Sequence, residues 1–108
     1  MSGSDPTVRV GNGGGAGGTN KCILRFTTVL ASPDPDVVAS VTDGQLLDIV
    51  RVDEPIRVIV AKTLFGEIVG AVSREIITLR ACIDEGHTYE AEVIQAAGGS
   101  VTVEVRNQ

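Results

Sequence analysis

The second half of the chain alternates apolar and polar residues strictly. Tyr89, Ala91 and Val93 alternate with glutamates within residues 87–96, and three valines alternate with polar residues within 100–106. Successive side chains of a strand point to opposite faces, so a period of two predicts strands with one buried face. The glycines between these two segments predict a hairpin turn.

The same alternation predicts further strands earlier in the chain. Asp43-Gly44 and Asp53-Glu54-Pro55 have the composition of turns, and the prolines of residues 32–36 cannot lie in a central strand. The strands expected between these breaks cover residues 22–30, 37–42, 45–52, 56–62 and 67–72. In the first strand Cys22, Leu24 and Phe26 share one face.

One helix is predicted over residues 73–85. Ser73 is a suitable N-cap, Gly86 is placed to end the helix, and an apolar stripe runs along it at three-to-four spacing. The stripe consists of Ile76, Leu79, Cys82 and Ile83, which leaves Arg74, Arg80, Asp84 and Glu85 to solvent. The predicted fold is mainly β: a small antiparallel β-barrel or strongly curved sheet of six to seven strands, with this helix covering one end or face.

Residues 1–19 are rich in glycine and predict a flexible arm, which leaves residues 20–108 as a single domain. Residues 13–18 formally match GxGxxG, the dinucleotide-binding fingerprint. That fingerprint must open a helix, whereas the next segment alternates like a strand. We therefore interpret the glycine tract as a linker.

Composition limits the kinds of partner. Asp and Glu outnumber Lys and Arg by 14 to 9, giving a net charge of −5, so long-range attraction to nucleic acid or an anionic membrane is not expected. No apolar run is long enough to span a bilayer, and the amino end lacks the pattern of a signal peptide. We expect a cytoplasmic protein without a membrane partner.

The two cysteines, Cys22 and Cys82, lie sixty positions apart and form no CxxC pair. A structural zinc site needs four ligands, so this spacing argues against one. Both cysteines fall on apolar phases of their segments, which predicts two buried free thiols in a reducing cytoplasm. Asp34 and Asp36 are too constrained by neighbouring prolines to converge on a cation. We predict no metal and no cofactor.

Nothing in the chain predicts catalysis. His87 is the only histidine, and it stands beside a glycine just past the predicted helix, where a cation favours the helix dipole without doing chemistry. No spacing directs Cys22, Cys82 or Ser100 toward it. We predict no catalytic residue and a non-enzymatic protein.

Among the polar residues, the arginines give the clearest indication of a binding surface. Three fall on polar phases or ends of predicted strands and a fourth in the first turn of the predicted helix: Arg25, Arg51, Arg57 and Arg74. If these strands are neighbours, the arginines form one basic patch on an acidic molecule. The alternative is scattered surface charge, paired with the carboxylates of Asp48, Asp53 and Glu67.

About half the chain resembles the HIRAN family of small β-barrel modules. The segments that carry this resemblance are DGQLL at 43–47, RVDEP at 51–55, FGEIVG at 65–70, LRACIDEG at 79–86 and YEAEV at 89–93. The resemblance implies a β-barrel module, and some members bind single-stranded DNA at its 3′ end. The Asn-Pro-x-Asp segment usual in the family is absent, and only Phe65 and Tyr89 remain as base-stacking aromatics in the matched region.

Two functions follow from these observations. The first is a non-enzymatic binding or interaction module whose partner is another protein, or a second copy bound through an exposed strand edge. The alternative is a single-stranded DNA-binding module of HIRAN type that uses Arg25, Arg51, Arg57, Phe65 and Arg74.

Overall fold

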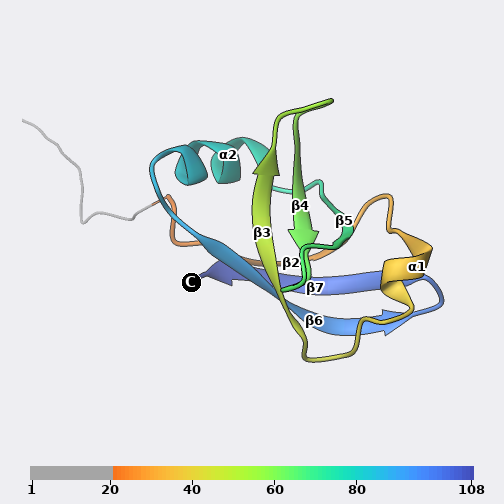
Figure 1. The fold of residues 1–108 in the computed structure, drawn as a ribbon. Helices are drawn as coiled ribbons and strands as arrows, with labels where there is room; N and C mark the ends of the chain where they lie inside the picture. The colour runs from red at the N-terminus through yellow and green to blue at the C-terminus, as the bar shows by residue number, and fades with distance from the viewer. Residues whose placement is uncertain (1–20) are drawn as a thin grey trace, which may run out of the picture.

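A computed structural model describes residues 21–108. The predicted arm at 1–19 and its GxGxxG match lie outside the described residues. Within them the chain forms six strands and two short helices (Figure 1). In chain order these are β2 Arg25–Val29, α1 Pro35–Val38, β3 Leu46–Val52, β4 Val58–Lys62, β5 Ile68–Val72, α2 Ile76–Asp84, β6 Tyr89–Ala97 and β7 Ser100–Asn107.

The six strands form one antiparallel sheet in the order β2-β7-β6-β3-β4-β5. The sheet curls into a half-barrel, so that the chain leaving β2 meets the opposite edge strand, β5. There Ala31 and Ala71 exchange backbone hydrogen bonds of 2.8 and 2.9 Å, and the amide of Asp34 donates to the carbonyl of Val69 at 2.9 Å. The predicted mainly β fold is confirmed.

The concave face of the sheet holds the core, as the period of two predicts. Tyr89, Ala91 and Val93 of β6 are at most 1% exposed, and Val103 and Val105 of β7 are completely buried. From α2, Leu79 and Cys82 are also completely buried against this face, in agreement with the predicted stripe. The side chains between them on β6 and β7 lie on the outer surface.

The strand predicted over residues 37–42 is wrong. Residues Pro35–Val38 form helix α1, and the Asp34 carboxylate caps it by accepting hydrogen bonds from the amides of Asp36 and Val37. Proline at the first helical position loses nothing there, because that amide has no partner within the helix. Aspartate and proline, which were expected only to end a strand, therefore start a helix here.

Helix α2 begins later than predicted. It starts at Ile76 instead of Ser73, and Glu75 at the N-cap adopts a left-handed conformation with φ of 57° and no side-chain cap. The preceding Arg74 leaves the helix path: its guanidinium lies 5.7 Å from the ring centroid of Phe26 and donates to the Thr27 carbonyl at 2.7 Å. This contact with β2 is tertiary, so local helix signals did not reveal it.

The predicted end of α2 is confirmed. Gly86 has φ of +100°, a conformation that glycine adopts without the steric cost of a Cβ. The amides of Gly86 and His87 donate to the carbonyls of Ile83 and Cys82 at 3.0 Å each. These two bonds are the Schellman arrangement, and they turn His87 back toward the helix.

The prediction of two free thiols is also wrong, because Cys22 and Cys82 form a disulfide. One lies on the inward phase before β2 and the other on the inward stripe of α2, so both face the same core. The bond closes a loop of 60 residues, worth about 4 kcal/mol in the chain-entropy description. The Cys22 carbonyl also accepts from the Tyr89 hydroxyl and the Asn107 amide, and the latter's oxygen accepts from the Leu24 amide.

Neither helix within residues 21–108 combines the length and the apolarity needed to cross a bilayer.

Gly70 is predicted to be essential for closing the sheet. A Cβ on Gly70 would lie 3.0 Å from the Leu30 Cβ and 3.1 Å from the Ala31 carbonyl oxygen. We expect Gly70→Val to lower the free energy of unfolding by about 1–3 kcal/mol, because the backbone at the closure must move. Urea unfolding followed by circular dichroism measures this change in the free energy of unfolding. Ala97→Val, an exposed strand position, should change stability by less than about 0.5 kcal/mol; equal effects of the two would contradict the role of Gly70.

Alkaline pH is predicted to weaken the fold through Tyr89. Burial raises the pKa of this phenol above its ordinary value of 10.0. The folded state therefore favours the neutral phenol, and its stabilisation is present below pH 10 and lost as pH rises toward the higher folded pKa. Tyr89 is the only tyrosine and the chain has no tryptophan, so phenolate absorbance reports it alone. A midpoint at or below the unfolded value would refute this, and Tyr89→Phe should remove the effect.

Candidate functional site

A cleft lies where α2 meets the ends of β4 and β5. Strand β4 begins and β5 ends at this point, where Ile59 pairs with Val72, and the first turns of α2 lie beside them. Figure 1 shows α2 at the end of the sheet that also carries the β3–β4 hairpin. The cavity has a volume of about 230 Å³ and is lined by Arg57, Val58, Ile59, Ala71, Val72, Ser73, Ile76 and Arg80.

The walls of this cleft are mostly aliphatic. Valine, isoleucine and alanine side chains come from both strands, and Ile76 from the helix is 41% exposed. Arg57, Arg80 and Ser73 supply its polar groups. An apolar cavity with a few convergent polar groups is the usual form of a ligand site.

Asp53, in the β3–β4 turn, collects three arginines beside this cleft. Its carboxylate lies 2.8 Å from Nη2 of Arg80, 3.3 Å from Nε of Arg51 and 4.0 Å from Nε of Arg57. Arg51 also contacts Asp84, so three arginines face two aspartates in this network. The hydrogen bond from Arg80, followed by the charges of the arginines, holds the pKa of Asp53 below its ordinary value.

Arg80 is only partly satisfied by this network. Its side chain is 19% exposed, and its second terminal nitrogen, Nη1, is buried and has no hydrogen-bond partner within residues 21–108. A buried donor left unpaired costs about 1–3 kcal/mol. An acceptor that enters the cleft and reaches Nη1 therefore recovers this cost.

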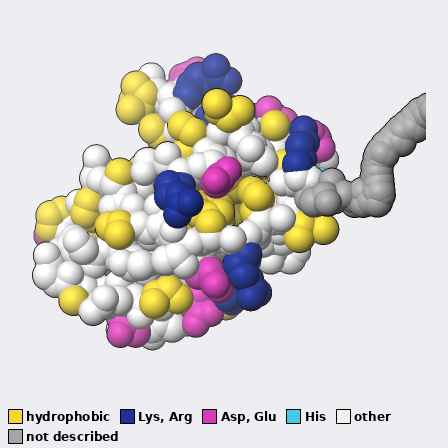
Figure 2. All heavy atoms as spheres, turned by 180° about the vertical axis from the view of Figure 1, so that it is seen from behind, with side chains coloured by type: hydrophobic (Ala, Val, Ile, Leu, Met, Phe, Trp, Pro, Cys, Tyr) yellow, Lys and Arg dark blue, Asp and Glu magenta, His cyan; other side chains and the backbone are white. Residues whose placement is uncertain are grey.

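The structure brings together only some of the predicted site residues. Arg51 and Arg57 meet at Asp53, one of the three carboxylates named in the alternative of paired surface charge. Arg74 lies over Phe26 on β2, and Arg25 is exposed on the same strand. In Figure 2 the basic side chains form separate groups with apolar and uncharged surface between them.

Phe65 stands apart from these arginines. It lies in the β4–β5 turn and is 93% exposed, whereas Arg57 precedes the start of β4. Five residues of strand separate the two, a length of about 17 Å. The residue that sequence reasoning missed is Arg80, which was expected in solvent. Its spacing of four from Ile76 was the available signal, because it places both on one helix face.

The outer face of β6 and β7 is the second charged region. Glu90, Glu92 and Glu104 stand there, on the polar phase of the alternating pattern. Arg106 lies among them, with its nitrogens 2.9, 2.8 and 3.2 Å from the three carboxylates. Hydrogen bonds to Glu92 and Glu90 raise the pKa of Arg106 above its ordinary value. This arginine already contacts three carboxylates, which makes the face a poor receptor for an anion.

Comparison with protein-family models, with curated proteins and with solved structures found no match. The resemblance to the HIRAN family therefore stays a prediction, and the cleft must be interpreted from its own chemistry.

Arg80 is predicted to control the ionisation of Asp53. Its hydrogen bond is the largest cause of the lowered pKa, so Arg80→Met should raise the Asp53 pKa toward 3.8. Because the folded pKa is depressed, the network stabilises the fold above about pH 3.8 and is lost as pH falls through the lower folded value. Carboxyl carbon NMR titration measures this shift. Arg25→Met is the control and should leave Asp53 unchanged; an equal shift in both variants would count against the assignment.

Proposed function

We propose that this domain is a non-enzymatic binding module that docks a protein partner in the cleft between α2 and the ends of β4 and β5. The bound segment places an apolar side chain against the aliphatic walls and a neighbouring carboxylate at Arg80 and Arg57. The observation that carries this proposal concerns Arg80, which lines this mostly apolar cavity. Its Nη1 is buried and has no hydrogen-bond partner among the described residues.

A carboxylate fits this position better than a neutral acceptor. Hydrogen bonds to a charged group are worth about 1.5–3 kcal/mol, roughly twice the value of neutral ones. Arg57 adds a second guanidinium whose side chain is 76% exposed and which reaches Asp53 only at 4.0 Å. Arg57 is therefore available to an incoming anion, whereas Arg51 is held by two aspartates.

A protein segment fits the walls better than nucleic acid. The described residues that line the cleft are mostly aliphatic and include no aromatic ring on which a base would stack. The molecule carries a net charge of −5, which opposes a phosphate backbone outside the immediate network. A protein segment with an acidic residue beside an aliphatic one can contact both the arginines and the aliphatic walls of the cleft.

The test uses small probes that separate the two contributions. Pentanoate carries an apolar tail and a carboxylate, pentanol carries the tail alone, and inorganic phosphate carries charge alone. In nitrogen-15 NMR titrations we expect pentanoate to shift the amides of Val58, Ala71 and Ile76 and to bind about tenfold more tightly than pentanol. Phosphate alone should bind more weakly than pentanoate.

Two variants and a control sharpen this test. Arg80→Met removes the guanidinium, and Ala71→Leu fills the cavity while leaving both arginines. Each should weaken pentanoate binding at least about tenfold, whereas Arg25→Met should bind like the unaltered protein. Pentanoate that binds all three variants equally, or does not shift the cleft amides, would contradict the proposal.

Single-stranded DNA is the second candidate, and the 93% exposure of Phe65 is the observation that favours it. A labelled oligothymidylate measured by fluorescence anisotropy at low salt tests it, because counterion release favours binding most there. Binding that Phe65→Ala and Arg57→Met both weaken would favour DNA over a protein segment. Self-association through an exposed strand edge also stays a prediction.

A further inference from the structure

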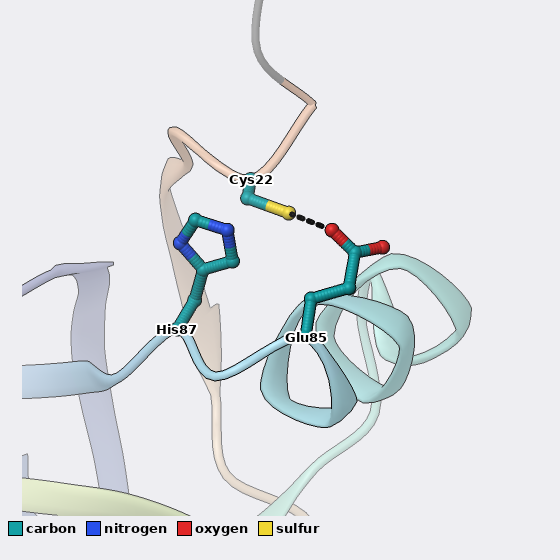
Figure 3. Close-up of side chains that lie close together, drawn as sticks. All are labelled: Cys22, Glu85 and His87. Carbon is teal, nitrogen blue, oxygen red and sulfur yellow. Dashed lines mark hydrogen bonds between the residues drawn. The ribbon is translucent and has the colours of Figure 1, made fainter.

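A second cluster of reactive side chains lies at the opposite end of α2 from the cleft, and it contains Cys22, Glu85 and His87 (Figure 3). One ligand atom from each residue lies within 4.8 Å of the other two. The sulfur of Cys22 is 4.0 Å from Oε1 of Glu85, the contact that is dashed in Figure 3. Cys22 is buried, His87 is half-buried and Glu85 is exposed, so the cluster is reachable from solvent.

The end of α2 builds this cluster from residues close in sequence. Cys82 and Glu85 are three positions apart and therefore share a helix face. Gly86 then turns the chain, and the bond from the His87 amide to the Cys82 carbonyl returns the imidazole to the same place. The disulfide joins Cys82 to Cys22, which makes Cys82 the fourth member of the cluster.

These four side chains are the ligand types that zinc prefers. Thiolate sulfur binds Zn²⁺ at about 2.3 Å, and imidazole nitrogen or carboxylate oxygen at about 2.0–2.2 Å. Two such ligands of a tetrahedral ion are about 3.5 Å apart. Movements of about an ångström would therefore bring Cys22, Glu85 and His87 onto one ion. In the disulfide neither sulfur is a thiolate, which removes two of the four ligands.

We propose that reduction of the Cys22–Cys82 disulfide creates a binding site for a zinc-class divalent cation, with Cys22, Cys82, Glu85 and His87 as ligands. A dithiol reductant supplies two electrons and two protons: the S–S bond breaks, two thiols form, and the reductant becomes its own disulfide. Binding of the cation then displaces the two thiol protons. The oxidised protein does not bind the cation.

The fold keeps the ligands in place without the disulfide. The Cys22 carbonyl accepts hydrogen bonds from the side chains of Tyr89 and Asn107, and these do not depend on the sulfur. Glu85 is held in the oxidised state by Lys21, whose Nζ lies 3.4 Å from Oε2. The Lys21 side chain is 64% exposed, so a surface ion pair of this kind is a weak competitor for Glu85.

The test uses Co²⁺ as a spectroscopic probe for a zinc site. The full chain is reduced with a dithiol, separated from it under argon and titrated with Co²⁺, beside the oxidised chain. We expect thiolate-to-cobalt charge-transfer absorption with one equivalent in the reduced protein, none in the oxidised protein, and displacement by Zn²⁺. Absence of these bands after reduction, or equal binding by the oxidised chain, would overturn the proposal.

Ligand variants distinguish this site from binding by two thiols alone. In the reduced state His87→Ala and Glu85→Gln should each weaken Co²⁺ binding by at least about tenfold. Loss of a residue that only supports a ligand already lowers metal affinity by about that much, and loss of the ligand itself should cost more. Glu67→Gln is the matched control and should bind normally. If reduction unfolds the chain, Co²⁺ should restore the β-sheet circular dichroism. Unfolded chain that binds without refolding, or ligand variants that bind like the control, would also overturn the proposal.

Discussion

The curled sheet depends on the close approach of residues 30–33 to Gly70 on β5. A sheet of six strands has two edges, and here they meet through the pair of hydrogen bonds between Ala31 and Ala71. Glycine fits this approach without strain, whereas a Cβ at position 70 would press on the Leu30 side chain and the Ala31 carbonyl. Because this closure fixes the end of β5, it also fixes the start of α2 and the shape of the cleft.

Helix α2 connects the two sites. Its first turns contribute Ile76 and Arg80 to the cleft. Its last turn and its C-cap contribute Cys82 and Glu85 to the proposed cation site. The helix has nine residues, too few to be stable alone in water, so its position depends on tertiary contacts. Burial of Leu79, the disulfide of Cys82 and the turn at Gly86 supply those contacts.

Charge in this molecule is organised locally, against a net charge of −5. Asp53 gathers three arginines next to an apolar cavity, whereas Arg106 is surrounded by three glutamates on the outer face of the sheet. In the first arrangement the Arg57 side chain is 76% exposed, whereas in the second Arg106 already contacts three carboxylates. In the proposed binding mode, the carboxylate of the partner meets Arg57 and Arg80 beside the aliphatic walls of the cleft.

The sequence by itself determined the sheet, because the period of two in residues such as Val93 and Val103 reflects which face is buried. It also determined the end of α2, where Gly86 acts through local backbone geometry. Only the tertiary structure decided that Cys22 meets Cys82 and that Arg80 reaches Asp53, since each pair is far apart in sequence and joins through the curl of the sheet. At Pro35 a local interaction, capping by Asp34, outweighed the alternation that predicted a strand. At Ser73 the tertiary contact of Arg74 with β2 outweighed the local capping signal.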